Sequence, residues 1–487
     1  MSKPSLFEVL AGRPDEAVVF VGDERKWTAA AVRAEIAALG ERLADARVVA
    51  VLADNGPAWA IADLATLAAG RVHLPLPSFF SPEQLRHALE ASGADSVLTD
   101  QPERIGRLDL GFAITGHWQG LTWLRRVVAA AGLPAGTAKI SFTSGSTGTP
   151  KGVCLSAEGL HDTASAVTRR LFDLPLQRHL AVLPLGLLLE NVAGLHAPLL
   201  REMPVHLPPL ARLGWQGMAG FDPAALQAAV TAAQPGSLIL VPELLKAWSL
   251  YLATNGQRSA ATLHYVAVGG ARVDRSLLEQ ARALGIPAYQ GYGLTECGSV
   301  VSLNRPGDDA DDVGRPLEHA EIRVSDGEVL VRARAFLGYT GTNASPSSAE
   351  FTTGDLGEFT GNGHLRLAGR RKNLLITSFG RNISPEWVEA VLLAQPAILQ
   401  AIVGGEAEAT LSAVLVPLPG VSDSQLAAAV AAANLRLPDY ARIGQWQRSA
   451  PFSAANGLAT GNGRPRRDAI LARFAADRAA LLQPQET

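Results

Sequence analysis

The stretch TSGSTGTPKG, from Thr143 to Gly152, indicates both the fold and the chemistry of this chain. It combines three glycines, several hydroxyl side chains and Lys151, and it follows the run 138–142, which predicts the end of a strand. Glycines let backbone N–H groups turn toward one point and let an anion approach closely. The stretch therefore predicts a phosphate-binding loop, although it lacks the spacing of a Walker A loop. A plain surface loop is the alternative that this composition also allows.

The whole chain sets limits on the class of protein. Its 487 residues are too many for one ordinary core, so we expect two or three domains. A net charge of −3 gives no electrostatic argument for binding nucleic acid. The two cysteines, Cys154 and Cys297, have neither disulfide nor zinc spacing. Since we find no signal-type segment and no run of about 18 apolar residues, we expect a cytoplasmic protein with no membrane span.

Helical and strand-like segments alternate along most of the chain. Apolar residues three or four positions apart predict a first helix, and the run 47–53 follows it as a buried strand. Ser81 and Gln84 form a capping box that opens another helix. Further strands are predicted at 96–98, 179–183, 237–241 and 264–268. The alternation predicts an α/β fold of mostly parallel sheets, in which ligands bind where strands end.

The pattern changes from about Glu321. A strand is predicted at 328–332, and the segment 356–368 predicts a hairpin folded about Gly361–Gly363. A helix capped at Ser384, strands at 398–403 and 411–416 and a helix at 425–434 follow. These elements are enough for a small α+β domain.

Three later motifs accompany the loop: GYGLTE at 291–296, TGDLG at 353–357 and GRRK at 369–372. In this order they resemble the signatures of the adenylate-forming superfamily, which includes acyl-CoA synthetases, nonribosomal-peptide adenylation domains and luciferases. The resemblance covers most of the chain. It implies a large, multi-layered N-terminal domain, residues 1–371, of parallel sheets, helices and a small β-barrel-like subdomain. A small, mobile α+β domain, residues 372–487, is implied to follow.

The resemblance also implies an ATP site. Tyr292 would lie against adenine, Asp355 would accept hydrogen bonds from the ribose hydroxyls, and Glu296 would hold Mg²⁺. These roles suit an aromatic face and carboxylate oxygens. The other implied nucleotide-binding residues are Thr143, Ser144, Gly145, Ser146, Thr147, Gly148, Gly270, Ala271, Gly293, Thr295 and Arg370. Thr147, Lys151 and Glu296 are implied to act in catalysis as well.

Three residues of the C-terminal part take functional positions by the same resemblance. Lys372 takes the hinge position, about which the small domain turns between half-reactions. Gly380 is implied to flank the tunnel for the pantetheine of CoA. The segment 456–467, NGLATGNGRPRR, puts Arg464 where relatives carry a catalytic lysine. Arginine keeps the charge but is a wider, forked donor, so the exchange is not conservative.

The acid-binding pocket is implied to be bordered by Leu187, Val241, Gly269 and Gly291. Relatives often carry a histidine or an aromatic residue after the Leu-Pro-Leu run, whereas this chain has leucines at 187–189. This more apolar wall favours a hydrophobic acid. The wall also lacks the aspartate that amino-acid-activating domains use, which disfavours an amino-acid substrate.

The resemblance thus predicts an AMP-forming acyl-CoA synthetase, closest in its motifs to the long-chain branch. It would join a hydrophobic acid, most simply a fatty acid, to AMP and then pass the acyl group to CoA. One alternative is an acyl-AMP ligase that loads the phosphopantetheine of an acyl carrier protein. Another is a nucleotide-binding protein in which Arg464 has weakened or abolished catalysis.

Overall fold

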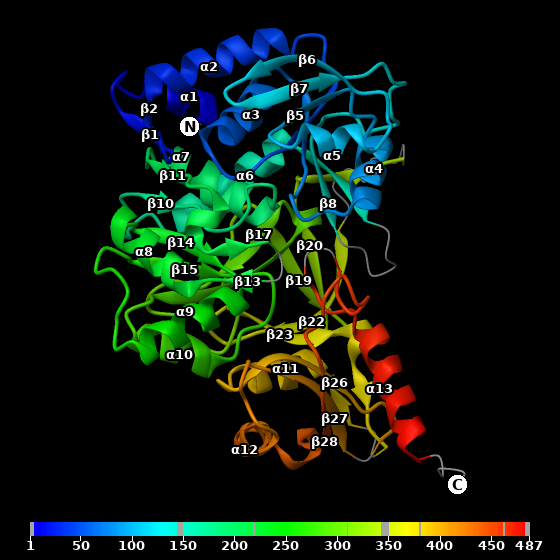
Figure 1. Ribbon diagram of the computed structural model, residues 1–487. Helices are drawn as coiled ribbons and strands as arrows, with labels where there is room; N and C mark the ends of the chain where they lie inside the picture. Colours follow the sequence, from blue (N-terminus) through cyan, green and yellow to red (C-terminus); the bar gives the residue numbers. More distant parts are fainter. Residues whose placement is uncertain are drawn as a thin grey trace.

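The computed structural model describes residues 4–143, 150–217, 220–308, 310–341, 350–378, 381–408, 410–460 and 463–482. Figure 1 shows a large part built of sheets and helices above a smaller C-terminal part. The smaller part holds α11 (Pro385–Leu393), α12 (Asp423–Asn434) and α13 (Arg467–Leu482). The predicted α/β fold class, with a large part followed by a small one, is confirmed.

One strand of an eight-stranded sheet leads into the predicted phosphate loop. Its hydrogen-bonded order is β21 (Phe336–Tyr339), β9 (Lys151–Ser156), β8 (Thr137–Thr143), β4 (Val72–Pro75), β3 (Val48–Leu52), β5 (Ser96–Thr99), β7 (Leu121–Arg125) and β6 (Ala113–Trp118). The central strands β8, β4, β3 and β5 are parallel. The five residues of β3 are all buried, as expected for a strand covered on both faces.

A nine-stranded sheet carries the other predicted motifs. Its order is β18 (Arg315–Pro316), β17 (Ser299–Leu303), β16 (Ala288–Leu294), β15 (Tyr265–Val268), β14 (Ser237–Leu240), β10 (His179–Leu180), β11 (Val205–His206), β1 (Val18–Val21) and β2 (Lys26–Thr28). The run from β10 through β14 and β15 to β16 is parallel, so the ends of these strands lie at one edge of the sheet.

One helix, α6 (Ala157–Arg170), joins the two large sheets. It contacts β8 and β9 of the first sheet and β17 of the second. Ser156 caps it by accepting a hydrogen bond from the Gly159 N–H at 3.1 Å, as the sequence predicts. The other helices of the large part are α1 (Leu6–Gly12), α2 (Ala29–Arg42), α3 (Pro57–Ala68), α4 (Pro82–Ala91), α5 (Pro102–Gly106), α7 (Ala197–Leu200), α8 (Pro223–Ala233), α9 (Pro242–Thr254) and α10 (Arg275–Ala283).

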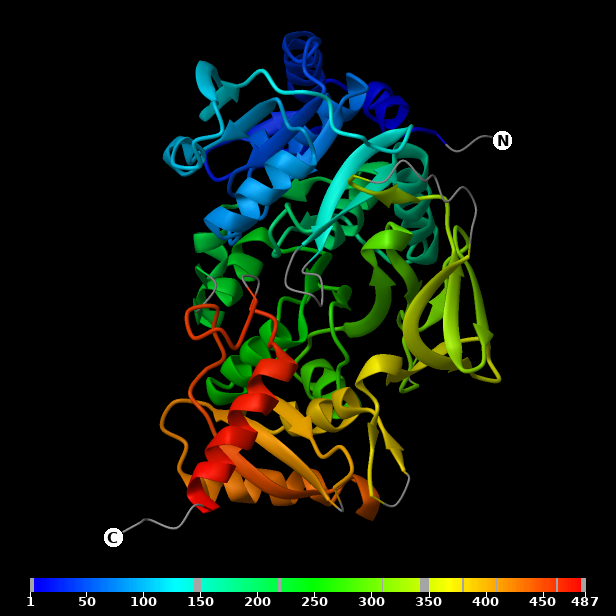
Figure 2. The ribbon, with the colours of Figure 1, turned by 90° about the vertical axis from the view of Figure 1, so that its right-hand side faces the viewer.

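Four smaller sheets complete the part of the molecule that the structure describes, and two of them have only two strands: β12 (Trp215–Gln216) with β13 (Gly220–Phe221), and β24 (Leu375–Ile376) with β25 (Asn382–Ile383). An antiparallel sheet of four strands links the two parts and contains the predicted hairpin: β19 (Glu321–Ser325), β20 (Glu328–Arg332), β22 (Phe351–Phe359) and β23 (Leu365–Arg370). The C-terminal part has a three-stranded sheet of β26 (Ile398–Gly404), β27 (Leu411–Pro417) and β28 (Ile443–Arg448). Figure 2 shows the four-stranded sheet beside the large part and above this C-terminal sheet. Within the described ranges, no helix combines the length and the apolar character needed to cross a membrane.

Two local predictions differ from the structure. The strand predicted at 179–183 ends at Leu180, because the Asn55 side chain takes up the backbone groups that follow. Asn55 donates to the Leu183 carbonyl at 2.9 Å and accepts from the Leu185 N–H at 2.8 Å. Helix α11 begins after Ser384, but the Ser384 hydroxyl makes no cap. It lies 2.9 Å from a Glu386 carboxylate oxygen instead.

A buried charged cluster, which we call the Asp63 cluster, connects α3, β4, β8 and a π-helix at Glu190–His196. The Asp63 carboxylate lies 2.6 Å from Lys139 Nζ, 2.6 Å from His73 Nδ1 and 2.7 Å from His196 Nε2. Asn191 also donates to it, at 3.0 Å. Burial tends to raise the pKa of Asp63, but the charges of Lys139, His73 and His196 outweigh that effect and hold the pKa well below its ordinary value.

Candidate functional site

The predicted site residues lie at the ends of strands from both large sheets. Strand β8 ends at Thr143, β15 is followed by Gly269, and β16 runs into a short 3₁₀ helix at Thr295–Cys297. Parallel strands bring their ends to one edge, where open α/β sheets bind ligands. The predicted phosphate-loop residues Ser144, Gly145, Ser146, Thr147 and Gly148, and the predicted tunnel residue Gly380, lie outside the described residues.

Two cavities meet at Thr295. The apolar cavity has a volume of about 190 Å³ and runs between α6, the π-helix and strands β14 to β17. Its lining includes Val167, Leu171, Leu176, Leu189, Met203, Leu238 and Ile239. The junction cavity, of about 220 Å³, is lined by Thr143, Pro150, Leu187 and Arg464, among others. Thr295 borders both, so this residue lies between the apolar cavity and the more polar junction cavity.

The predicted pocket residues divide between these cavities. Gly269 and Gly291 line the apolar cavity, whereas Leu187 lines the junction cavity. Val241 packs beside Gly270, since a Cβ built at Gly270 would lie 3.6 Å from Val241 Cγ1. Ala271, the residue after Gly270, is exposed.

Tyr292, Asp355 and Arg370 form one hydrogen-bonded group. The Tyr292 hydroxyl donates to Asp355 Oδ2 at 2.6 Å, and Arg370 Nε lies 2.7 Å from Asp355 Oδ1. Burial raises the pKa of Asp355, while the charge of Arg370 and the Tyr292 hydrogen bond oppose that rise. The pKa of Tyr292 is raised by burial and by the neighbouring carboxylate. The group therefore presents a fixed carboxylate beside an aromatic ring.

A second group joins Glu296 to the end of the phosphate loop. The Tyr339 hydroxyl donates to Glu296 Oε1 at 3.1 Å, and Lys151 Nζ lies 5.5 Å from the centre of the Tyr339 ring. No motif marks Tyr339, because it begins the stretch 339–353, whose sequence is typical of a loop. Lys151 and Glu296, 145 positions apart, are thus linked through one tyrosine.

Gly293 is required by a close backbone approach. A Cβ at this position would lie 1.6 Å from the Ser299 carbonyl oxygen, so no larger residue fits between β16 and β17. The pairing of these strands shifts register between Tyr292 and Gly293. Ser299 itself has a φ of 99°, which non-glycine residues rarely adopt and which often occurs at functional sites.

The predicted catalytic residue of the C-terminal part reaches the large part. Arg464 is accessible from the junction cavity, where it lies with Thr143 and Thr295. Burial against the protein and the charge of Arg370 lower the pKa of Arg464, while the charges of Asp355 and Glu386 oppose this shift. Arginine nevertheless stays protonated in proteins. Lys372, the predicted hinge residue, is exposed in a 3₁₀ turn directly after Arg370.

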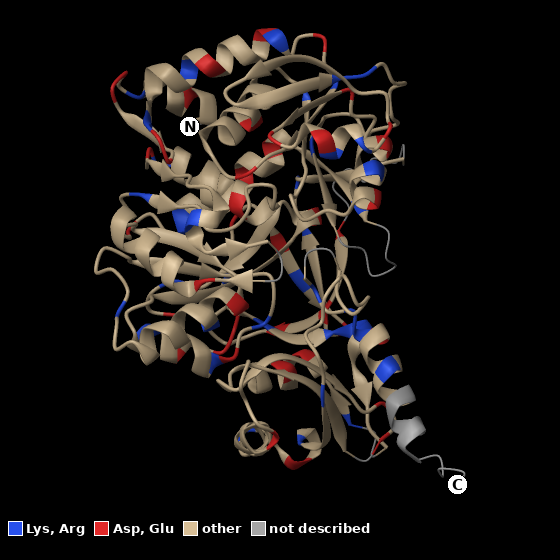
Figure 3. Ribbon diagram, in the orientation of Figure 1, with Lys and Arg blue, Asp and Glu red and all other residues tan. Residues whose placement is uncertain are grey.

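Two basic side chains fasten the C-terminal part to the large part. Lys246 of α9 donates to the carbonyl oxygens of Leu393 at 2.5 Å and Gln395 at 2.8 Å, and also to that of Ile398. Arg436, after α12, forms an ion pair with Asp274 at 2.7 Å. Figure 3 shows basic and acidic residues on both sides of this boundary. The Leu393 carbonyl stands at the end of α11, where carbonyls lack partners within the helix, so Lys246 satisfies it from the large part.

Replacing Lys246 with methionine is expected to loosen this contact, because methionine matches the apolar stem but cannot donate to the three carbonyls. We expect chymotrypsin to cleave near the junction of the two parts several-fold faster than in the wild type. Arg442→Met is the matched control, since Arg442 pairs with Asp439 inside the C-terminal part. Equal cleavage rates for the Lys246 variant and the wild type would contradict this role.

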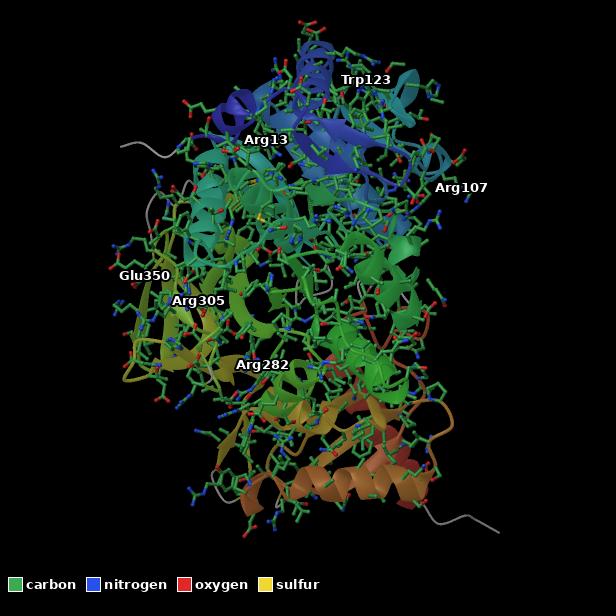
Figure 4. All side chains as sticks on the ribbon, turned by 90° about the vertical axis from the view of Figure 1, so that its left-hand side faces the viewer. Arg13, Arg107, Trp123, Arg282, Arg305 and Glu350 are labelled. Carbon is green, nitrogen blue, oxygen red and sulfur yellow. The ribbon has the colours of Figure 1, made fainter. Side chains whose placement is uncertain are left out.

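An ion pair also holds the far wall of the apolar cavity. Both terminal nitrogens of Arg305, which is labelled in Figure 4, lie 2.7 Å from the Asp173 carboxylate oxygens. Arg305 Nη1 also donates to the Arg170 carbonyl at 3.0 Å. Since Leu171 and Leu303 line the cavity close to these residues, the pair fixes the end of α6 against the end of β17.

Comparisons with known proteins agree with this arrangement. The sequence profile of the AMP-binding enzyme family matches residues 6–334. The 2-succinylbenzoate–CoA ligase of Salmonella typhimurium is 32% identical over 388 residues, which cover 75% of this chain and 74% of that protein. A long-chain-fatty-acid–CoA ligase of Mycobacterium bovis is 29% identical over 431 residues, covering 73% and 70%.

The fold also matches a solved structure. The O-succinylbenzoate coenzyme A synthetase of Bacillus subtilis, in complex with AMP, superimposes with a TM-score of 0.76 at 23% identity, covering 96% of this chain and 98% of that one. At this identity the likeness concerns the fold alone. The family is identified by the profile match over residues 6–334 and by the relative that is 32% identical. The chain belongs to the AMP-binding enzyme family, the adenylate-forming enzymes that its motifs resemble.

Proposed function

We propose that the protein is an AMP-forming acyl-CoA ligase for a hydrophobic carboxylic acid. It would use ATP to form an acyl-adenylate and pyrophosphate, and then transfer the acyl group to the thiol of CoA. The observation that carries this proposal is Thr295, which borders both the apolar cavity and the junction cavity that contains Arg464. An acid whose chain fills the first cavity would present its carboxylate to the second.

The first half-reaction joins two anions. A carboxylate oxygen of the acid attacks the α-phosphorus of ATP, and the bond to the pyrophosphate oxygen breaks. Arg464, Arg370 and Lys151 supply positive charge around the junction cavity, and such fixed charges stabilise the charge that develops in the transition state. In the second half-reaction the thiol sulfur attacks the acyl carbonyl carbon, AMP leaves, and the thiol proton passes to solvent.

Asp355 is the proposed partner of the ribose hydroxyls. Its two carboxylate oxygens can accept from both hydroxyls, and Tyr292 and Arg370 hold it in place. The Tyr292 ring provides an aromatic face for adenine. The segment at Gly269 and Gly270 lacks side chains, which suits a ring packed on the backbone.

Glu296 is the proposed protein ligand of Mg²⁺. Mg²⁺ is usually bound by one or two carboxylates together with substrate phosphates and water. The described residues contain no group of three or more acidic, histidine or cysteine side chains that could hold a metal by themselves. A single carboxylate that a tyrosine orients fits this need. The ion would supply charge neutralisation at the phosphates.

We propose that the boundary between the two domains lies between Arg371 and Lys372. The C-terminal part has its own hydrophobic core, which includes Leu375, Val388, Val403 and Leu415. Because Arg464 comes from this part and Asp355 from the other, movement about Lys372 would make and break the adenylation site.

The acid is proposed to be hydrophobic and most simply a fatty acid. The predominantly apolar lining of the cavity supports this class. The relatives differ in their substrates, since one is a ligase for 2-succinylbenzoate and another a ligase for long-chain fatty acids. The walls contributed by α6 and β14 extend along the strands, which suits an elongated chain better than a compact one.

A substrate panel tests the proposal. The full chain is mixed with ATP, Mg²⁺, CoA and either fatty acids of graded length or aromatic acids, and pyrophosphate, acyl-adenylate and acyl-CoA are measured together. We expect pyrophosphate and acyl-CoA with an elongated acid. An adenylate that accumulates without acyl-CoA would indicate a carrier protein as the acceptor. No pyrophosphate with any acid would contradict the proposed activity.

A further inference from the structure

The apolar cavity has one polar side that a plain fatty acid does not use. His179 and Ser237 line the cavity on neighbouring parallel strands, directly opposite each other in the pairing of β10 with β14. Both side chains are buried, as is Glu190 behind them. Burying polar groups beside apolar walls costs free energy unless the groups are satisfied.

The three side chains form a hydrogen-bonded row. His179 Nε2 lies 3.0 Å from Glu190 Oε1, and His179 Nδ1 lies 3.0 Å from Ser237 Oγ. The other oxygen of Glu190 accepts from the Leu183 N–H at 3.0 Å. Both ring nitrogens of His179 are therefore occupied, and Ser237 is the end of the row that borders the cavity.

Ser237 keeps hydrogen-bonding capacity toward the cavity. A hydroxyl offers one proton and two acceptor positions, and the bond to His179 uses one of these. If the imidazole donates to Glu190, Ser237 donates to the ring and can accept from a ligand. If Glu190 carries the proton, the ring donates to Ser237, whose own proton is then available. The 3.0 Å separations at both ring nitrogens fit either arrangement. Burial raises the pKa of Glu190, while the bonds from His179 and Leu183 oppose this rise.

Three other polar side chains that line the cavity donate to backbone carbonyls. The Tyr265 hydroxyl donates to the Asn304 carbonyl at 2.8 Å, and the Thr168 hydroxyl donates to the Ala164 carbonyl at 2.9 Å. Arg201 donates to the Leu174 carbonyl at 3.0 Å and to that of Leu171. Ser237 thus differs from its neighbours, because its proton can be directed to either side.

The position of Ser237 defines which part of an acid it would meet. Ser237 begins β14, and Val241 directly follows the end of that strand, near the nucleotide side. Four residues of a strand span about 13 Å. A group that contacts Ser237 therefore lies far along the chain from the reacting carboxylate.

We propose that Ser237, supported by His179 and Glu190, is a specificity subsite for a hydroxyl group on the acyl chain, at the end of the cavity away from the carboxylate and one strand length, about 13 Å, from Val241. This inference rests on the proposed function and names its substrate class as hydroxylated aliphatic acids. A hydroxyl can donate and accept, so it matches both arrangements of the row. A methyl group at the same place would leave the buried Ser237 without a second partner.

Matched acids test the subsite in the full-length enzyme. The kcat/KM for acid-dependent pyrophosphate release is measured for straight-chain acids and for their ω-hydroxy counterparts over a range of lengths. At the length that reaches Ser237, we expect about a tenfold preference for the hydroxy acid. Ser237→Ala should remove this preference, measured as the ratio of kcat/KM for the hydroxy acid to that for the plain acid, while leaving the KM for ATP unchanged.

Thr168→Val is the matched control, because it removes a hydroxyl from the opposite wall of the same cavity. It should keep the preference. A wild-type preference for plain acids at every length, or a preference that persists in Ser237→Ala, would overturn the subsite.

Calorimetric binding of the same acid pairs separates this proposal from the proposed function. In one outcome, no acid is turned over, but the hydroxy acid binds more tightly than the plain acid and Ser237→Ala abolishes this difference in affinity. That result would support the subsite and contradict the ligase activity. If the wild-type protein binds the two acids with equal affinity, the subsite is contradicted, whether or not the enzyme turns over either acid.

Discussion

Replacing Arg464 with alanine is expected to lower the rate of acyl-adenylate formation by about 10²–10³-fold, the usual effect of removing one group that stabilises transition-state charge. The expectation follows from the position of Arg464 in the junction cavity with Thr143 and Thr295. Acid-dependent exchange of pyrophosphate into ATP measures this half-reaction alone. The rate of acyl-CoA formation from supplied acyl-adenylate should change much less.

Two further variants separate charge from shape. Arg464→Lys keeps the positive charge and should retain much more exchange than Arg464→Ala. Arg466→Ala removes an exposed arginine two positions along the same segment and should leave exchange near the wild-type rate. If Arg464→Ala exchanges pyrophosphate as fast as the wild type, Arg464 has no part in adenylation.

Replacing Asp63 with asparagine is expected to lower the free energy of unfolding by about 3–5 kcal/mol. The change removes the charge that balances buried Lys139, while the volume and most hydrogen-bonding positions remain. Because Lys139 belongs to β8 and Asn191 to the π-helix, the loss should reach both cavities. The shift of the urea unfolding midpoint of the large part measures the effect.

A double variant tests whether the charge itself is responsible. Lys139→Met removes the uncompensated cation, so Asp63→Asn combined with Lys139→Met should be less destabilised than the sum of the single changes. Asp439→Asn, at an exposed ion pair, serves as the control and should shift stability by less than about 0.5 kcal/mol. Additive single effects would indicate that Asp63 acts through packing and not through Lys139.

Local signals predicted much of the fold. Ser81 and Gln84 form both halves of the expected capping box. This prediction succeeds because it depends on residues that are close in the sequence. The hairpin between β22 and β23 succeeds for the same reason, since its turn residues lie next to the strands they join.

Long-range partners account for what the sequence did not reveal. His73 reads as an isolated structural or surface residue, yet it lies against Asp63 and near Lys139, 66 positions further along the chain. Tyr339 and Lys246 carry no motif and gain their meaning only from Glu296 and from the carbonyls of the C-terminal part. The motifs predicted residues that the structure brings together, such as Tyr292 and Asp355, whereas the polar row at Ser237 depends on the pairing of two distant strands.

The π-helix at Glu190–His196 makes this segment sensitive to length more than to composition. Its first residue, Glu190, belongs to the polar row, and Asn191 and His196 belong to the Asp63 cluster. A π-turn contains one residue more than an α-turn. Winding the same seven residues as an ordinary α-helix would rotate the side chains after the extra residue by about 100° relative to those before it, so Glu190 and His196 could not both keep their partners. An inserted residue should therefore be tolerated less well at this point than most single substitutions.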